Sequence, residues 1–137
     1  MTKSRGNRQP IIMIADSDED ERTLLKSILK LIGFRVVEAS DGPQAIRLAR
    51  LKSPDLIVLD LELPGLDGRV GLQKIRKQSS PQLPIIAVST DETRQHRGGL
   101  STVFVSKPIE YEQLYALIGR FLPRKRIPFE KPKALAA

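Results

Sequence analysis

Short apolar runs alternate with amphipathic segments along this chain of 137 residues. Five runs are predicted strands, at residues 11–15 (IIMIA), 34–39 (FRVVEA), 56–59 (LIVL), 85–88 (IIAV) and 102–105 (TVFV), and the continuously apolar runs 11–15 and 56–59 are typical of strands buried within a sheet. Most of the intervening segments carry apolar residues at helical spacing, as in the stripe Leu24, Leu25, Ile28, Leu29 and Ile32. This alternation predicts an α/β fold in which right-handed β-α-β units form a doubly wound, five-stranded parallel sheet.

One predicted unit lacks its helix. Residues 91–99 (DETRQHRGG) contain no large apolar side chain, so a helix there would have no face to bury. We expect a fourth helix that is short or missing. The last helix is predicted from Leu114, Leu117, Ile118 and Phe121, which share one helical face.

The formal net charge of +7 is concentrated at the two ends of the chain. Residues 1–10 carry +3 and residues 120–137 carry +5, so the segment between them carries a net charge of −1. We expect a basic N-terminal tail (1–10), one globular domain (11–121) and a basic, proline-rich C-terminal tail (122–137). The chain has no cysteine and a single histidine, His96, which excludes disulfides, thiolate metal sites and histidine clusters.

No apolar run is long enough to span a membrane, and residues 1–10 lack the apolar core of a secretory signal. A cytoplasmic protein without membrane insertion is therefore expected.

Polar side chains follow several predicted strands. Asp16, Asp60 and Ser89 end the first, third and fourth strands, and Lys107 follows the fifth. The carboxyl ends of parallel strands meet at one edge of a sheet, so these four side chains are expected to converge. Two carboxylates can hold Mg²⁺, while a hydroxyl and an ammonium group can bind phosphoryl oxygens. Taken singly, the aspartates are also typical helix caps and Lys107 an ordinary surface lysine.

These stretches resemble the receiver domain of two-component response regulators. The resemblance rests on IADSDEDER after the first strand, PDLIVLDLELPGLDG around the third, IIAVST at the fourth and FVSKP after the fifth. It implies a flavodoxin-like strand order of 2-1-3-4-5.

The resemblance also implies roles for individual residues. Asp60 corresponds to the phosphoryl-accepting aspartate, Lys107 to the lysine that pairs with the phosphoryl group, and Ser89 to the switch hydroxyl. Glu62 would offer its backbone carbonyl to Mg²⁺, alongside the carboxylates of Asp16 and Asp60. Pro108 falls where the family has a cis Lys-Pro peptide, and Phe104 falls at the aromatic switch position.

Ser17 departs from the family pattern. It occupies the second position of an acidic pair whose second member normally binds the metal, so an anionic ligand is replaced by a neutral one. A weakened Mg²⁺ site is expected. Asp18 could compensate by reaching back from the first turn of the helix, whereas the remaining acids up to Glu21 are expected to serve the helix dipole.

The leading hypothesis is a stand-alone receiver, not a metabolic enzyme, that accepts a phosphoryl group on Asp60 from a histidine kinase or phosphotransfer protein. Its output would be a contact with a downstream protein partner. The alternative is a phosphorylation-independent adaptor, a pseudo-receiver, which is favoured by Ser17, Phe104 and the polar segment 91–99. A monomer is expected in either case.

Three other interpretations receive less support from the sequence. The basic tails could bind nucleic acid, but charged proline-rich tails are more often solvated extensions. The motif Asp16-Ser17-Asp18 resembles the start of haloacid-dehalogenase-type hydrolases, yet no matching later acidic pair follows. A calcium loop is disfavoured because Glu21 stands where that loop needs glycine.

Overall fold

The computed structural model describes residues 8–90 and 101–122, which form one α/β domain. Five parallel strands make a single sheet in the order β2-β1-β3-β4-β5, which confirms the predicted order. The strands are β1 (Ile11–Ala15), β2 (Arg35–Ala39), β3 (Leu56–Asp60), β4 (Ile85–Ser89) and β5 (Thr102–Ser106). The helices of the described residues are α1 (Glu19–Ile32), α2 (Gly42–Lys52), α3 (Gly68–Lys77) and α4 (Tyr111–Phe121).

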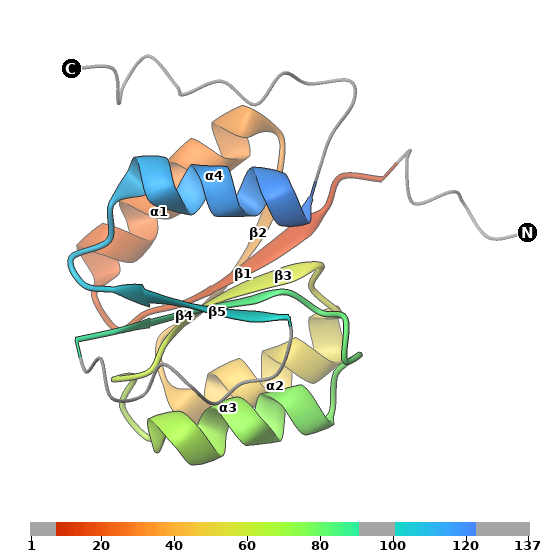
Figure 1. Ribbon diagram of the computed structural model, residues 1–137, viewed down its shortest axis with the longest axis vertical. Coiled ribbons are helices and arrows are strands. Elements are labelled where there is room, and N and C mark those ends of the chain that lie inside the picture. The colour runs from red at the N-terminus through yellow and green to blue at the C-terminus, as the bar shows by residue number, and fades with distance from the viewer. Residues whose placement is uncertain (1–7, 91–100, 123–137) are drawn as a thin grey trace, which may run out of the picture.

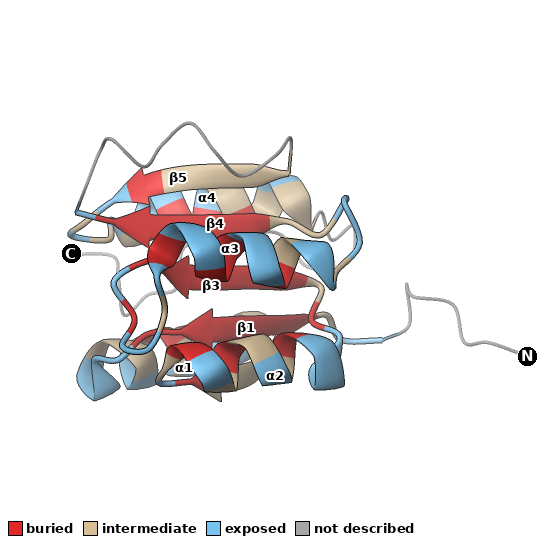
Figure 2. Cartoon of the chain, turned by 90° about the horizontal axis from the view of Figure 1, so that it is seen from below, coloured by how far each residue is buried: buried red, intermediate tan, exposed pale blue. Residues whose placement is uncertain are grey.

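The helices cover both faces of the sheet, α1 and α4 on one side and α2 and α3 on the other (Figure 1). Strand side chains alternate between two cores: Ile12 and Ile14 of β1 pack on the α1–α4 side, and Met13 packs on the α2–α3 side. Both faces of the central strands are buried (Figure 2), which explains why their sequences are continuously apolar.

Aspartates set the starts of the first two helices. The Asp18 carboxylate accepts a hydrogen bond from the Glu21 amide at 3.1 Å, and the Asp41 carboxylate accepts one from the Gln44 amide at 2.8 Å. Gly33 ends α1 with a φ of 114°, and its amide bonds to the carbonyl of Leu29. The Asp18 and Asp41 caps fix where the chain turns after β1 and β2, at the edge where these strands end.

Several expectations fall on undescribed parts of the chain. The segment 91–99, for which a short or missing helix was predicted, and most of the two basic tails lie outside the described residues. In the part that the structure describes, no helix is long and apolar enough to cross a membrane.

Gly42 holds the start of α2 against the loop that follows β3. Its amide donates to the Pro64 carbonyl at 2.7 Å, and a Cβ at position 42 would lie 2.6 Å from the Gly65 carbonyl oxygen. The obstruction is backbone and not the end of a flexible side chain, so this contact requires glycine. The loop that carries the residues after Asp60 is thereby anchored to α2.

We expect Gly42→Ala to lower the free energy of unfolding by about 2 kcal/mol, because the added methyl group forces two backbone segments apart. Urea unfolding followed by circular dichroism measures the change. Arg47→Ala, at an exposed position of the same helix, serves as the control and should stay within about 0.5 kcal/mol of the wild type. Equal stability of Gly42→Ala and the wild type would contradict the close contact.

Candidate phosphoacceptor and metal site

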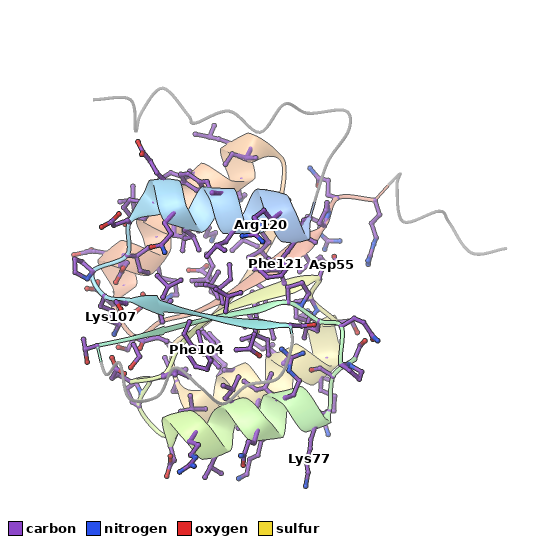
Figure 3. All side chains as sticks on the ribbon, viewed as in Figure 1. Asp55, Lys77, Phe104, Lys107, Arg120 and Phe121 are labelled. Atoms are coloured by element: carbon purple, nitrogen blue, oxygen red, sulfur yellow. The ribbon has the colours of Figure 1, made fainter. Side chains whose placement is uncertain are left out.

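Polar side chains gather where the parallel strands end. The structure brings Asp16, Asp60 and Ser89 to this edge, where they are 6%, 5% and 6% exposed and are the buried polar residues of the described core. Lys107 follows β5 at the same edge (Figure 3), and its amide donates to the Ser89 carbonyl at 3.1 Å. The predicted convergence of these four residues is therefore observed.

Asp60 and Lys107 form an ion pair at the centre of the site. The Lys107 Nζ lies 3.0 Å from Asp60 Oδ2, and the other carboxylate oxygen, Oδ1, accepts a hydrogen bond from the Glu62 amide at 2.8 Å. Burial opposes protonation of Lys107, but the hydrogen bond and charge of Asp60, together with Glu62, raise the pKa of the ammonium group. Lys107 is consequently a fixed positive charge beside a buried carboxylate.

Asp16 is held in place by the loop that joins β1 to α1. Its Oδ1 accepts a hydrogen bond from the Asp18 amide at 2.9 Å, and its backbone carbonyl accepts one from Arg22 Nη1 at 2.7 Å. Arg22 is itself paired with Glu38 on β2 at 3.2 Å. The Asp16 carboxylate thus faces the site from a backbone that is tied to the neighbouring strand.

The Glu62 side chain makes contacts that the sequence analysis did not assign. Its Oε2 accepts a hydrogen bond from Ser89 Oγ at 2.6 Å, while Oε1 accepts from the Thr90 amide at 3.0 Å and the Thr90 hydroxyl at 3.2 Å. Oε1 also lies 3.4 Å from Lys107 Nζ. Burial opposes ionisation, but these hydrogen bonds and the charge of Lys107 outweigh it and lower the pKa of Glu62.

Glu21 is a second residue that the sequence analysis left outside the site. Burial, the charge of Asp16, a hydrogen bond to the Asp16 carboxyl and the charge of Asp18 raise the pKa of Glu21 to about 7, despite the opposing charge of Lys107. The available signal was its position four residues before the buried Leu25, on the stripe of α1 that faces the sheet. Glu21 is accordingly only partly exposed.

The remaining predicted residues occupy less central positions. Ser17 is exposed, and the Asp18 carboxylate caps α1, so a role for Asp18 in metal binding stays a prediction. The Lys107–Pro108 peptide bond is cis, as expected. Phe104 is partly buried and packs on the α2–α3 side of the sheet (Figure 3).

The oxygen ligands at this edge fit Mg²⁺. Asp16, Asp60 and Lys107 line a small cavity together with apolar side chains. Among the described residues, no three acidic or histidine side chains are arranged to hold a metal ion. Mg²⁺ commonly uses one or two protein carboxylates and retains several waters, so the carboxylates of Asp16 and Asp60 fit its preferred donors.

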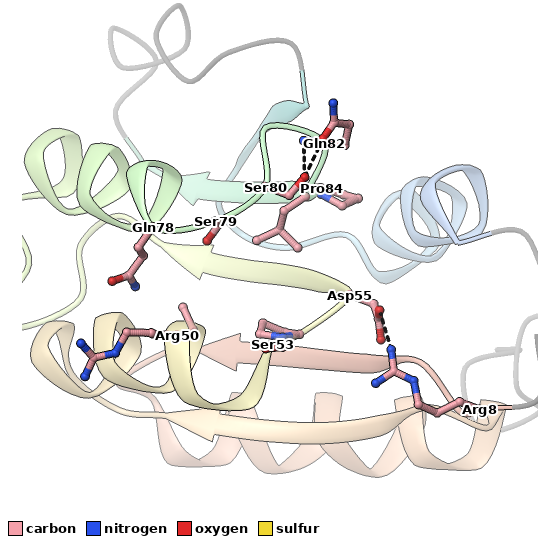
Figure 4. Close-up of a pocket in the computed structure, with 12 residues that line it drawn as sticks. Arg8, Arg50, Ser53, Asp55, Gln78, Ser79, Ser80, Gln82 and Pro84 are labelled. Carbon is pink, nitrogen blue, oxygen red and sulfur yellow. Dashed lines mark hydrogen bonds and ion pairs between the residues drawn. The ribbon is translucent and has the colours of Figure 1, made fainter. Parts of the chain in front are cut away.

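A cavity of about 440 Å³ lies at the opposite edge of the sheet (Figure 4). Its charged lining includes Arg8 and Asp55, which form an ion pair at 3.2 Å, and Asp55 Oδ2 also accepts a hydrogen bond from the Ile11 amide at 2.8 Å. These contacts tie the start of β1 to the start of β3. The residues that line this cavity are different from those that line the cavity beside Asp60, and its ion pair joins the segments that precede β1 and β3.

Comparison with known proteins identifies the family. Residues 12–119 match the model of the response regulator receiver domain. The chain belongs to this family, whose members are signalling modules of two-component systems. The predicted family is thereby confirmed.

Relatives and solved structures agree with this assignment. The chain is 34% identical over 121 residues to the probable transcriptional regulator ycf27 of Cyanophora paradoxa, covering 85% of this chain and 50% of that protein. It is 30% identical over 128 residues to the sensor histidine kinase CheAY of Helicobacter pylori, covering 87% of this chain and 16% of that protein. The chain thus spans half or less of the length of these relatives.

Among solved structures, the receiver domain of the sensor histidine kinase PA1611 from Pseudomonas aeruginosa superimposes with a TM-score of 0.71 at 28% identity, covering 83% of this chain and 98% of that domain. That structure has a magnesium ion coordinated in its active site cleft. The non-phosphorylated HemR receiver domain from Leptospira biflexa gives a TM-score of 0.73 at 27% identity, with coverage of 84% and 95%.

The raised pKa of Glu21 predicts a pH-dependent stability. Its folded-state pKa of about 7 exceeds the ordinary value of 4.5, so the associated stabilisation is complete below 4.5 and is lost as the pH rises through 7. In EDTA, the free energy of unfolding of the wild type should therefore fall relative to that of Glu21→Gln by about 1 kcal/mol between about pH 5 and pH 8, allowing for solvent screening.

Urea unfolding at a series of pH values measures this difference. Glu19→Gln removes the same charge from an exposed position of the same helical turn and should follow the wild type across the range. Parallel pH profiles for the wild type and Glu21→Gln would contradict the raised pKa of Glu21.

Proposed function

We propose that this receiver domain accepts a phosphoryl group on Asp60 and passes the signal to another protein. One observation carries the proposal: the buried Asp60 carboxylate is paired with Lys107 Nζ at 3.0 Å, beside the Ser89 hydroxyl and the Asp16 carboxylate. A nucleophile, a positive charge and a hydroxyl donor are thus assembled at the edge of a rigid sheet.

The transfer uses Asp60 as the nucleophile. An Asp60 oxygen attacks the phosphorus of a phosphohistidine on the donor protein, so that an O–P bond forms as the P–N bond breaks. The bonding electrons leave with the imidazole, which takes up a proton. Lys107 neutralises the negative charge on the phosphoryl oxygens, and the Ser89 hydroxyl donates a hydrogen bond to one of them.

Mg²⁺ would be held by Asp16, Asp60 and the backbone carbonyl of Glu62, with Asp18 as a further ligand. When bound, it supplies positive charge beside the acceptor carboxylate and the phosphoryl oxygens. The magnesium in the active site cleft of the PA1611 receiver supports this assignment by analogy. The neutral Ser17 reduces the negative charge around the metal, so we expect weaker binding than two adjacent aspartates would give.

A histidine kinase or a phosphotransfer protein would supply the phosphoryl group. Phosphorylation would then shift an equilibrium between two conformations around Ser89 and Phe104 and change the surface offered to the protein that receives the signal.

A phosphorylation-independent adaptor is the second candidate function, and Ser17 is the observation that favours it. If the serine prevents metal binding, the receiver fold acts as a protein-binding module whose surface is independent of Asp60.

Intact-protein mass spectrometry distinguishes the two functions. After incubation with acetyl phosphate and Mg²⁺, the wild type should gain the mass of one phosphoryl group, because the donor is activated and Asp60 is the buried nucleophile. The gain should disappear in Asp60→Asn and in EDTA. Lys107→Met should slow the reaction by about 100-fold or more, since a positive charge beside the transferring group is lost.

Glu110→Gln, which removes a carboxylate just before α4, is the matched control and should react like the wild type. Phosphorylation that persists in Asp60→Asn would place the acceptor elsewhere. If the wild type gains no mass and binds no Mg²⁺ by isothermal titration calorimetry, the adaptor function is correct and phosphoryl transfer is excluded.

A further inference from the structure

The Glu62 carboxylate interacts with Ser89 and Lys107, the two groups that the proposed function assigns to a phosphoryl group, and with the neighbouring Thr90 amide. Ser89 Oγ and the Thr90 amide donate to its two carboxylate oxygens at 2.6 and 3.0 Å, and Lys107 Nζ lies 3.4 Å away. A hydroxyl, a backbone amide and an ammonium group are the donors that recognise a phosphate oxygen. In this structure all three are turned toward a carboxylate of the protein itself.

The position of this carboxylate places it close to the acceptor. Lys107 Nζ contacts Asp60 Oδ2 at 3.0 Å and Glu62 Oε1 at 3.4 Å, so one ammonium group bridges the two acids. A phosphoryl group on Asp60 would bring further anionic oxygens next to this ammonium. Two anions that share the same donors at such distances repel each other strongly, so Glu62 and the phosphoryl oxygens cannot use these donors together.

We propose that the Glu62 carboxylate is an internal competitor for the phosphoryl site, holding the Ser89, Thr90 and Lys107 donors until an oxyanion on Asp60 displaces it. This inference rests on the proposed function and extends it, because it assigns the Glu62 side chain to the phosphoryl pocket in addition to the role of its backbone carbonyl in metal binding. The Glu62 side chain is a positioning group and not the acceptor.

The competition has two consequences. Displacing Glu62 costs the free energy of the contacts it loses, so the phosphoryl group is bound less strongly than it would be without Glu62. The side chain must also leave the pocket when Asp60 is modified. Glu62 precedes the loop that Gly42 and Pro64 anchor to α2, so the displaced carboxylate changes the charge of the surface between this loop and the end of β4.

The first experiment tests the hydrogen bond from the Thr90 amide to Glu62 in the unmodified protein. In ¹H–¹⁵N NMR spectra without Mg²⁺, Glu62→Gln should move the Thr90 amide proton upfield, because a bond to a charged acceptor is replaced by a weaker bond to a neutral one. Glu19→Gln removes the same charge at an exposed position of α1 and should leave the Thr90 amide unchanged. An unchanged Thr90 amide in Glu62→Gln would overturn the proposal before any phosphoryl analogue is added.

The second experiment measures the competition directly. Beryllofluoride with Mg²⁺ mimics the phosphoryl group on an aspartate and needs no transfer chemistry. Glu62→Gln and Glu62→Ala should both reach half-saturation at a concentration about tenfold lower than the wild type, which corresponds to at least one charge-assisted hydrogen bond regained by the ligand. Glu19→Gln should reach half-saturation at the same beryllofluoride concentration as the wild type, which would exclude a general effect of net charge.

The outcomes separate this proposal from the proposed function. Equal affinity of the wild type and both Glu62 variants would overturn the competition while leaving phosphoryl acceptance intact. If neither the wild type nor the variants bind beryllofluoride, the site is not a phosphoryl site, and both proposals fail. Tighter binding by both Glu62 variants, with an unchanged Glu19→Gln, supports both.

Discussion

The ion pair between Asp60 and Lys107 is the interaction on which the site depends. A buried carboxylate is costly unless a partner compensates its charge, and the partly buried Lys107 compensates that of Asp60. The partner follows β5, two strands away from β3 in the sheet order β2-β1-β3-β4-β5. The pair therefore requires β4 and β5 to be correctly paired, and it connects the chemistry of Asp60 to the whole of that half of the sheet.

Negative charge exceeds positive charge around this pair. Asp16 and Asp60 are buried, Glu62 contacts Lys107, and the charge of Asp16 acts on the partly buried Glu21. The two glutamates differ in how they accommodate this charge. Hydrogen bonds favour the ionised form of Glu62, whereas burial and the charge of Asp16 favour the protonated form of Glu21. A divalent cation would relieve the remaining repulsion, which gives a physical reason why phosphoryl transfer to Asp60 should require Mg²⁺ even with Ser17 in the acidic pair.

The backbone of the site was predictable from the sequence, because strand ends are marked by abrupt changes from apolar to polar residues. Asp16, Asp60, Ser89 and Lys107 follow such changes, and parallel pairing brings strand ends together whatever the details of packing. The side-chain contacts of Glu21 and Glu62 were not predictable in the same way. They depend on where a flexible carboxylate finds donors, and this is decided by neighbours that are distant in sequence, such as Ser89, 27 residues after Glu62.

Glu21 and Glu62 interact with groups on either side of Asp60, the proposed acceptor. Glu21 lies within the electrostatic influence of Asp16, a proposed metal ligand, and Glu62 accepts from Ser89, a proposed donor to the phosphoryl group. Groups that the proposed metal and phosphoryl ligands would use thus already interact with a glutamate of the chain. Such a site binds its ligands less tightly than an empty one, but it resists adventitious anions and gives the ligand-free state a defined conformation. The proposed switch needs a ligand-free conformation that is as well defined as the phosphorylated one, and the contacts of Glu21 and Glu62 would provide it from within the chain.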